Sequence, residues 1–505
     1  MLRSRFKNQV TTYGHQVLMK RLADLTLSSV WTLNGLFKMI DNEKMVKIFG
    51  SNARGDTLEE YAANSENKYV RSQVQLAIAS EQAKGRKITA KEALDLYGLD
   101  ILEKVAVDGS APLVNSRDEP ANTLRRRRED LKLDIRDIEK LSGLDTKVLK
   151  NLETPGKASK IRDIERVASL LALDERIVGF REQAGGDREL GVRLRELRST
   201  VDAKTFDASS VLKLAEAGWI VSRQNELGRV LKIDVHPIVA KGTLQSDDYS
   251  YVSAEKGYAL AEKARAELGL KPDEPIVSIR ELLERKLGVP LVQDKLTSRF
   301  AGATIANGSN RGIVVNEAGQ NEKVWVRRMT LAHEIGHLVG DPDQRLNKLR
   351  VDSYDSLKGL ANEADNVERR ANGFAVAFLA PPSAVRAIAQ QKSTSLDILE
   401  TVMNTFGVSM TAAAYHIQNI AKLDVSSVHP RDIKDQSQEW VARENLTLDY
   451  FPINETPLNR RGRFASLVVR AEKLGHISDD TAATWLNTTV EKYCQASSEI
   501  LELQE

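Results

Sequence analysis

The chain has 505 residues, which at roughly 150 residues per domain predicts about three folded units and excludes a single small module. Its 73 Lys and Arg residues nearly balance 71 Asp and Glu residues, so any DNA-binding surface must be local. Low Pro and Gly contents favour a helix-rich globular protein. The single cysteine, Cys494, excludes an intrachain disulfide and a Cys-based zinc ribbon. With no long apolar segment, we expect a cytoplasmic protein without membrane contacts.

Residues 1–118 have a helical pattern, and we expect a helical N-terminal region of unknown role. A short helix is predicted from residue 88 to residue 99, with Thr89 as its cap and Glu92 at the capping-box position. A polar stretch at residues 108–122 is the first predicted linker. The role of the region stays open between a sensor, a dimerisation element that would make the protein a homodimer, and an autoinhibitory cap.

Residues 119–180 are predicted to form a small bundle of amphipathic helices. A helix at residues 135–141, a turn at Gly143 and a helix at residues 146–152 follow the helix-turn-helix layout. Residues 123–174 therefore resemble the Cro/C1-type (XRE) helix-turn-helix family, including Glu153 after the third helix. The resemblance implies that this third helix enters the major groove of DNA.

The candidate DNA contacts lie on the first and third helices of this bundle. They are Arg125, Arg126, Thr146, Lys147, Lys150 and Asn151, whose side chains suit phosphates or base edges. The run of four arginines at residues 125–128 would contact phosphates. The alternatives are a solvated basic helix face or an acidic partner within the chain, and acidic neighbours leave open a module that binds protein instead.

The remaining chain is predicted in three parts. Residues 181–250 form a connector with a helix near residues 211–217 and a β-like stretch at residues 229–239. Residues 251–425 contain a helix from residue 254 to residue 268, a second from 278 to 287, and strands near residues 289–292, 301–305 and 312–316. Residues 426–505 are helical. The fold class is therefore α+β: mainly α with a small β-sheet, in several domains.

The sequence HEIGH at residues 333–337 matches the H-E-x-x-H pattern. On a helix, His333 and His337 lie on the same face and can bind one metal ion, with Glu334 beside them as general base. Apolar residues on most sides predict a buried helix, and Gly340 followed by Pro342 predicts where it ends. The alternative is a buried helix with two hydrogen-bonded histidines.

Catalytic zinc usually has three protein ligands, so a third must come from elsewhere. The best candidate is Glu368, at the start of an amphipathic helix that must end before the prolines at 381 and 382. Taken alone, Glu368 would be an ordinary solvated carboxylate. Together with the H-E-x-x-H motif, it becomes the predicted third ligand of a Zn²⁺ ion.

These motifs resemble the ImmA/IrrE metallopeptidases over roughly residues 254–490. The resemblance rests on residues 327–338, on residues 368–382 and on residues 313–316, with weaker similarity at 406–409, 460–464 and 477–483. It implies a zincin-like core at residues 251–425, zinc held by His333, His337 and Glu368, and Glu334 as catalytic base. Arg370 stands where members often carry a second acidic residue, which removes a competing ligand.

Two functions are predicted. The first is a zinc endopeptidase that cleaves a helix-turn-helix repressor or antitoxin and so derepresses a stress, prophage or defence operon, with DNA bound through residues 123–174. The second is a DNA-binding regulator or antitoxin-like protein that uses the metallopeptidase fold as a sensor or interaction domain. An oxyanion donor is also expected, and His416, Tyr354 and Tyr415 are candidates by residue type only.

Overall fold

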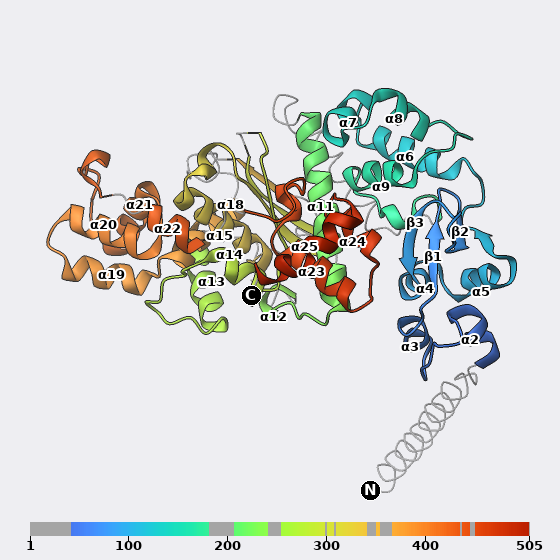
Figure 1. Ribbon diagram of the computed structural model, residues 1–505. Helices are drawn as coiled ribbons and strands as arrows, with labels where there is room; N and C mark the ends of the chain where they lie inside the picture. Colours follow the sequence, from blue (N-terminus) through green and yellow to red (C-terminus); the bar gives the residue numbers. More distant parts are fainter. Residues whose placement is uncertain are drawn as a thin grey trace, which may run out of the picture.

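The computed structural model describes nine stretches of the chain. They are residues 42–180, 207–240, 254–297, 300–307, 310–340, 350–353, 366–434, 437–444 and 450–503. Helices predominate in them, together with two four-stranded sheets, which confirms the α+β fold class. The N-terminal unit and the helices that follow α18 lie at opposite ends of the molecule, with α11 and the C-terminal helices between them (Figure 1).

The N-terminal unit contains a sheet, so the prediction of a wholly helical region is wrong for its strands. β1 (Lys68–Arg71), β2 (Gln75–Ile78), β3 (Arg86–Thr89) and β4 (Ser110–Pro112) form an antiparallel sheet of order β3-β1-β2-β4. Helices α2 (Asn42–Phe49), α3 (Leu58–Ala63), α4 (Ala90–Tyr97) and α5 (Leu99–Asp108) complete the unit. No strand of this sheet exceeds four residues, which is too short to show a clear alternation of apolar and polar residues. The apolar residues of these strands and of the adjacent helices therefore resembled a helical pattern.

Thr89 caps α4 as predicted, but the reciprocal hydrogen bond from Glu92 that would complete a capping box is absent. The Thr89 side chain accepts a hydrogen bond from the backbone N–H of Glu92. The Glu92 carboxylate is buried and accepts hydrogen bonds from the Ser478 backbone and the Thr481 hydroxyl instead. Glu92 therefore joins the N-terminal unit to the C-terminal helices.

The next unit is a bundle of α6 (Glu119–Asp130), α7 (Ile135–Ser142), α8 (Thr146–Leu152) and α9 (Ile161–Leu170), followed by a 3-10 turn η1 (Glu175–Ile177). These helices lie where the sequence predicts them. Gly143 ends α7 in the left-handed conformation, with φ at 70°, which explains the glycine at the turn. The predicted linker is shorter than expected, since it contains β4 and the start of α6.

A long helix, α11 (Ala208–Val230), crosses the middle of the molecule. It confirms and extends the helix predicted near residues 211–217. The prediction of a β-like stretch at residues 229–239 is wrong, because α11 continues to Val230 and a short helix, α12 (Pro237–Ala240), follows. Pro237 begins α12, where proline is well tolerated.

The second sheet has the order β5-β7-β6-β8. β5 (Leu291–Asp294) is parallel to β7 (Asn310–Asn316), whereas β6 (Phe300–Asn307) is antiparallel to both β7 and β8 (Arg350–Ser353). Three strands were predicted, at nearly these positions. α13 (Ala254–Glu267), the short α14 (Ile279–Glu281) and a π-helical turn η2 (Leu282–Lys286) precede the sheet.

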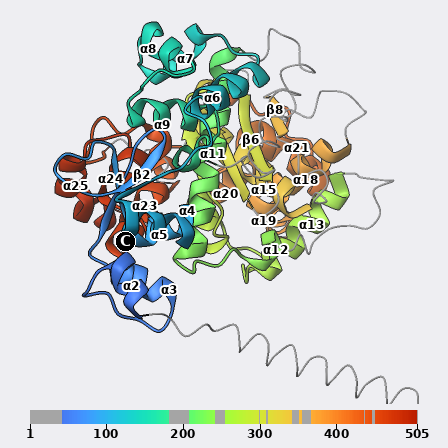
Figure 2. The ribbon, with the colours of Figure 1, turned by 90° about the vertical axis from the view of Figure 1, so that its right-hand side faces the viewer.

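Helices cover both faces of this sheet. Val314 of β7 belongs to the apolar core that includes α11, while its neighbours Ile313 and Val315 belong to the core around α15 (Val324–Gly340). Successive strand residues point to opposite faces, so α11 and α15 lie on opposite sides of the sheet (Figure 2). The helices around and beyond α15 are η3 (Gly319–Glu322), α18 (Asn366–Leu379), α19 (Pro382–Gln391), α20 (Ser395–Phe406), α21 (Met410–Ala421), η4 (Pro430–Asp432) and α22 (Ser437–Glu444).

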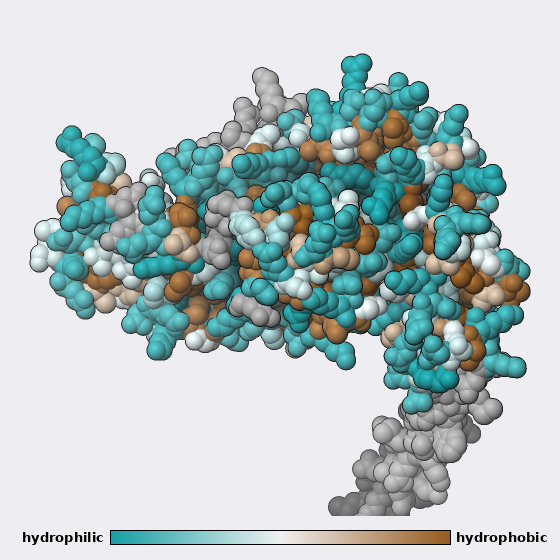
Figure 3. All heavy atoms as spheres, viewed as in Figure 1, coloured by the Kyte–Doolittle hydropathy of each residue, from teal (hydrophilic) through white to brown (hydrophobic). Residues whose placement is uncertain are grey.

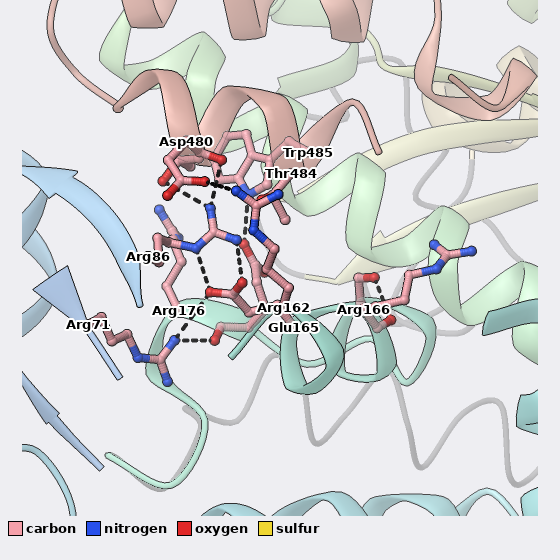
Figure 4. A network of polar contacts seen from close by, with 12 residues as sticks. Arg71, Arg86, Arg162, Glu165, Arg166, Arg176, Asp480, Thr484 and Trp485 are labelled. Carbon is pink, nitrogen blue, oxygen red and sulfur yellow. Dashed lines mark hydrogen bonds and ion pairs between the residues drawn. The ribbon is translucent and has the colours of Figure 1, made fainter. Parts of the chain in front are cut away.

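The C-terminal part consists of η5 (Leu458–Arg460), α23 (Arg463–Lys473), α24 (Asp479–Trp485) and α25 (Val490–Glu502). A buried polar network fixes it to the first two units (Figure 4). Arg86 of β3 pairs with Glu165 of α9 and donates to the backbone oxygen of Asp480. Arg162 of α9 donates to the Asp480 carboxylate at 2.7 Å. Segments almost 400 residues apart are thus packed as one body.

Hydrophilic side chains cover most of the face shown in Figure 3, with apolar residues in small groups between them. Among the helices in the described ranges, none is both long and apolar enough to cross a membrane.

Candidate metal centre

The helix that carries the H-E-x-x-H motif is α15, and it is buried almost throughout its length. One detail of the prediction is wrong, because Gly340 is the last residue of α15 and not a left-handed cap beyond it. A Cβ atom at Gly340 would lie 2.5 Å from the Leu260 side chain. The glycine is therefore required by packing against α13.

A second glycine brings α18 close to the motif. A Cβ atom at Gly336, between the two histidines, would lie 2.9 Å from the ring of Phe374 on α18. Without that Cβ, the aromatic ring packs directly against the backbone of α15. This contact places the first turn of α18, with Glu368, beside the two imidazoles.

The three predicted ligands converge. The Nε2 atoms of His333 and His337 lie 3.0 Å apart, and the Glu368 carboxylate oxygens lie 3.1 Å from His333 Nε2 and 3.5 Å from His337 Nε2. Both imidazoles are fully buried, whereas the Glu368 side chain is 18% exposed. One side of the cluster is therefore accessible.

This donor set fits zinc. Two ligand atoms on a tetrahedral Zn²⁺ ion, each at about 2.0–2.2 Å from the metal, lie about 3.3–3.6 Å apart. The three separations are close to that value, and all the candidate ligand atoms lie within 4.8 Å of one another. Two histidines and one glutamate form a known catalytic zinc set that leaves a fourth position open.

Asn372 orients the first histidine. Its amide oxygen lies 2.9 Å from His333 Nδ1. An amide oxygen only accepts hydrogen bonds, so Nδ1 carries the proton and the lone pair of Nε2 points toward His337 and Glu368. Such a partner fixes the tautomer of a metal-binding histidine and raises its basicity.

Glu334 is fully buried beside the cluster. The Thr304 hydroxyl on β6 donates a hydrogen bond to Glu334 Oε2. On the same strand, a Cβ atom at Gly302 would lie 3.0 Å from Glu334 Oε1. The strand thus holds one carboxylate oxygen and, through the glycine, leaves room beside the other.

The oxyanion candidates have other surroundings. His416 is buried, and its Nε2 donates to the Ala380 backbone oxygen while Nδ1 accepts from the Tyr258 hydroxyl. Burial lowers the pKa of His416 to about 4, so it is a neutral packing residue. Tyr415 is 55% exposed, and Tyr354 lies outside the described residues.

The candidate DNA contacts occupy two exposed helix faces. Arg125 and Arg126 are exposed on α6, and Lys147, Lys150 and Asn151 are exposed on α8, while Thr146 is half-buried. The structure therefore leaves five of the six predicted side chains accessible to a partner.

The second half of the arginine run has an internal role. Arg127 is buried and donates to the backbone oxygens of Leu171 and Ala172. Arg128 pairs with Glu153, with both N···O distances between 2.7 and 2.8 Å. The alternative of an acidic partner within the chain thus holds for Arg128, and neither residue belongs to an exposed basic patch.

Sequence reasoning did not assign roles to Asn372 or Thr304. A signal for Asn372 was present, since it lies one turn after Glu368 and on the same helix face. No comparable signal existed for Thr304, which reaches Glu334 only because β6 lies against α15.

Comparison with curated proteins finds no match to this chain. Residues 287–418, which include the second sheet, α15 and α18, match the family model of the IrrE N-terminal-like domain, Peptidase_M78, so this part of the chain is similar to a metallopeptidase domain.

Proposed function

We propose that the protein is a zinc-dependent endopeptidase of the cytoplasm. The observation that carries this proposal is the convergence of His333, His337 and Glu368, with the buried carboxylate of Glu334 next to them. The match of residues 287–418 to a peptidase family supports the same reaction class.

Each residue then has a defined task. When bound, zinc would polarise the peptide carbonyl and acidify a water molecule. Glu334, held by the Thr304 hydroxyl, would take a proton from the attacking water and return it to the leaving amine. Asn372 would keep the proton of His333 on Nδ1, away from the ligand position.

The proposed substrate is a helix-turn-helix repressor or an antitoxin, whose cleavage would derepress a stress, prophage or defence operon. Residues 123–174 would bind DNA and bring the peptidase to such a substrate. The exposed Lys147, Lys150 and Asn151 on α8 support this role, because they suit phosphates and base edges. Because Arg127 and Arg128 make hydrogen bonds within the protein, only Arg125 and Arg126 of the run would contact DNA phosphates.

A second candidate function is a DNA-binding regulator that uses the peptidase-like part as a sensor or interaction domain. The same exposed residues of α8 favour it.

The Glu334→Gln variant separates the two functions. If the protein is a peptidase, the variant retains zinc and DNA binding but loses cleavage of a co-encoded repressor. The matched control is Glu322→Gln, because Glu322 lies in η3, outside the cluster. Cleavage by the Glu334→Gln variant at the wild-type rate, or no chelator-sensitive cleavage by the wild type, would exclude the peptidase function. The DNA-binding regulator would then be the remaining candidate.

A further inference from the structure

A small pocket lies outside the metal centre, where β7 begins beside α11. Its volume is about 220 Å³. It opens between the C-terminal half of α11, the start of β7 and the first residue of α23. Pockets for drug-sized ligands usually measure about 300–1,000 Å³, so this one suits an ion or a single compact group.

The lining is strongly basic. Arg229 from α11, Arg311 from β7 and Arg463 from α23 all border the pocket, and none of its described lining residues is a carboxylate. Arg86 and Arg460, by contrast, are paired with Glu165 and Glu216. Arg229 and Arg463 therefore give the pocket a positive charge, and guanidinium groups are well suited to binding an oxyanion.

The positive charge of Arg463 is only partly compensated. Within the described part of the chain, its side chain makes a single weak hydrogen bond, to Gln224 Oε1 at 3.5 Å. Burial lowers the pKa of Arg463, Glu284 raises it in part, and Arg470 lowers it further. The charged guanidinium would thus gain from an anion beside it.

Gln224 supplies an independent sign of a missing ligand. It is 1% exposed and lines the pocket, yet its Nε2 atom has no hydrogen-bond partner among the described residues. A buried amide donor without an acceptor is unfavourable. Arg463 also begins α23, whose N-terminus has no side-chain cap, and the positive end of a helix dipole favours an anion near it.

We propose that this pocket binds a phosphate group, carried either by inorganic phosphate or by a small phosphomonoester. The oxygens would accept from Arg463, Arg229 and the Gln224 amide. Such a ligand would connect α23 to α11 and β7, and so fix the C-terminal helices to the peptidase-type region. It requires neither zinc nor catalysis, so the proposal stands or fails separately from the proposed function.

The test is thermal unfolding and calorimetric titration of the full-length chain with inorganic phosphate and with glycerol 3-phosphate, against chloride at equal ionic strength. We expect saturable binding of at least one phosphate probe and a rise in the unfolding midpoint. The tighter probe identifies the form of phosphate that the pocket takes. Arg463→Gln should weaken binding at least about 10-fold, since it removes a charge-assisted donor.

Arg470→Gln is the matched control, because it removes the same charge from the same helix but does not line this pocket. It should bind phosphate more tightly than Arg463→Gln does, since it removes no donor that lines the pocket. If Arg463→Gln does not fold, the exposed Arg229→Gln variant replaces it, with weaker binding again expected. Phosphate effects no larger than those of chloride, or equal binding by the Arg463 (or Arg229) variant and the Arg470 variant, would overturn the proposal.

Discussion

His333 Nδ1 lies 2.9 Å from the side-chain oxygen of Asn372, one helical turn beyond Glu368. A single helix thus supplies both the third candidate ligand and the group that orients the first. Asn372→Ala should weaken zinc binding about 10- to 100-fold, the usual effect of removing a partner of a metal-binding histidine. Chelator competition measures this affinity. Asn372→Asp keeps an acceptor oxygen and should retain most of it, and unchanged affinity in the alanine variant would remove Asn372 from the site.

Thr304 is expected to act on catalysis and not on metal binding. Thr304→Val replaces the hydroxyl that donates to Glu334 with a methyl group of the same size. Hydrogen bonds to charged groups are worth about 1.5–3 kcal/mol, so kcat/KM for a peptide substrate should fall about 10- to 100-fold. Zinc content should be unchanged, and Thr304→Ser should restore activity. A loss of zinc in the valine variant would contradict this separation.

The polar network around α11 predicts a dependence of stability on acid pH. Burial alone would raise the pKa of Glu216, but Arg460 and Arg166 outweigh it and lower the pKa from 4.5 to about 2. The ionised carboxylate therefore stabilises the fold above pH 4.5, by about 3 kcal/mol, and this contribution is lost as the pH falls toward 2.

Thermal unfolding of the wild type and of Glu216→Gln across this pH range measures the effect. The variant should be less stable at pH 7, because the buried Arg460 and the half-buried Arg166 lose their charged partner. The difference between the two proteins should shrink as the pH approaches 2. A difference that stays constant with pH would show that Glu216 does not titrate as described.

The four arginines of α6 should separate into two pairs. For duplex DNA binding, the logarithm of the binding constant falls linearly with the logarithm of the salt concentration. Arg125→Gln and Arg126→Gln should each reduce the magnitude of that slope by about 0.9, the value for one phosphate contact. Arg128→Gln should instead lower the unfolding midpoint, since it breaks the pair with Glu153. Fluorescence anisotropy across a salt series and thermal unfolding give the two measurements. Equal salt slopes in all variants would exclude DNA contacts by α6.

Local sequence signals predicted much of this molecule. The spacing of His333 and His337, the amphipathic helix of Glu368 and the Gly143 turn depend on neighbouring residues, and the structure places each element accordingly. Short strands gave the N-terminal sheet no such signal, because β1 to β4 have at most four residues each. The pairing of segments such as β3 with α24 depends on contacts almost 400 residues apart.

The site shows the same division. Its ligands could be predicted because each lies on a periodic helix, although it is the packing of α18 on α15 that brings Glu368 to the two histidines. The roles of Thr304, of Gly302 and of the buried Arg127 come from packing between elements, which spacing along the chain does not report.

The metal content of the purified protein tests the central claim most directly. Elemental analysis should find one zinc ion per chain in the wild type and in Arg369→Ala, an exposed neighbour of the third ligand. Glu368→Ala should lose most of the metal, because two histidines alone hold zinc weakly. Wild-type protein without stoichiometric zinc, or a Glu368→Ala variant that retains it as firmly as Arg369→Ala, would contradict the assignment of His333, His337 and Glu368 as the metal site.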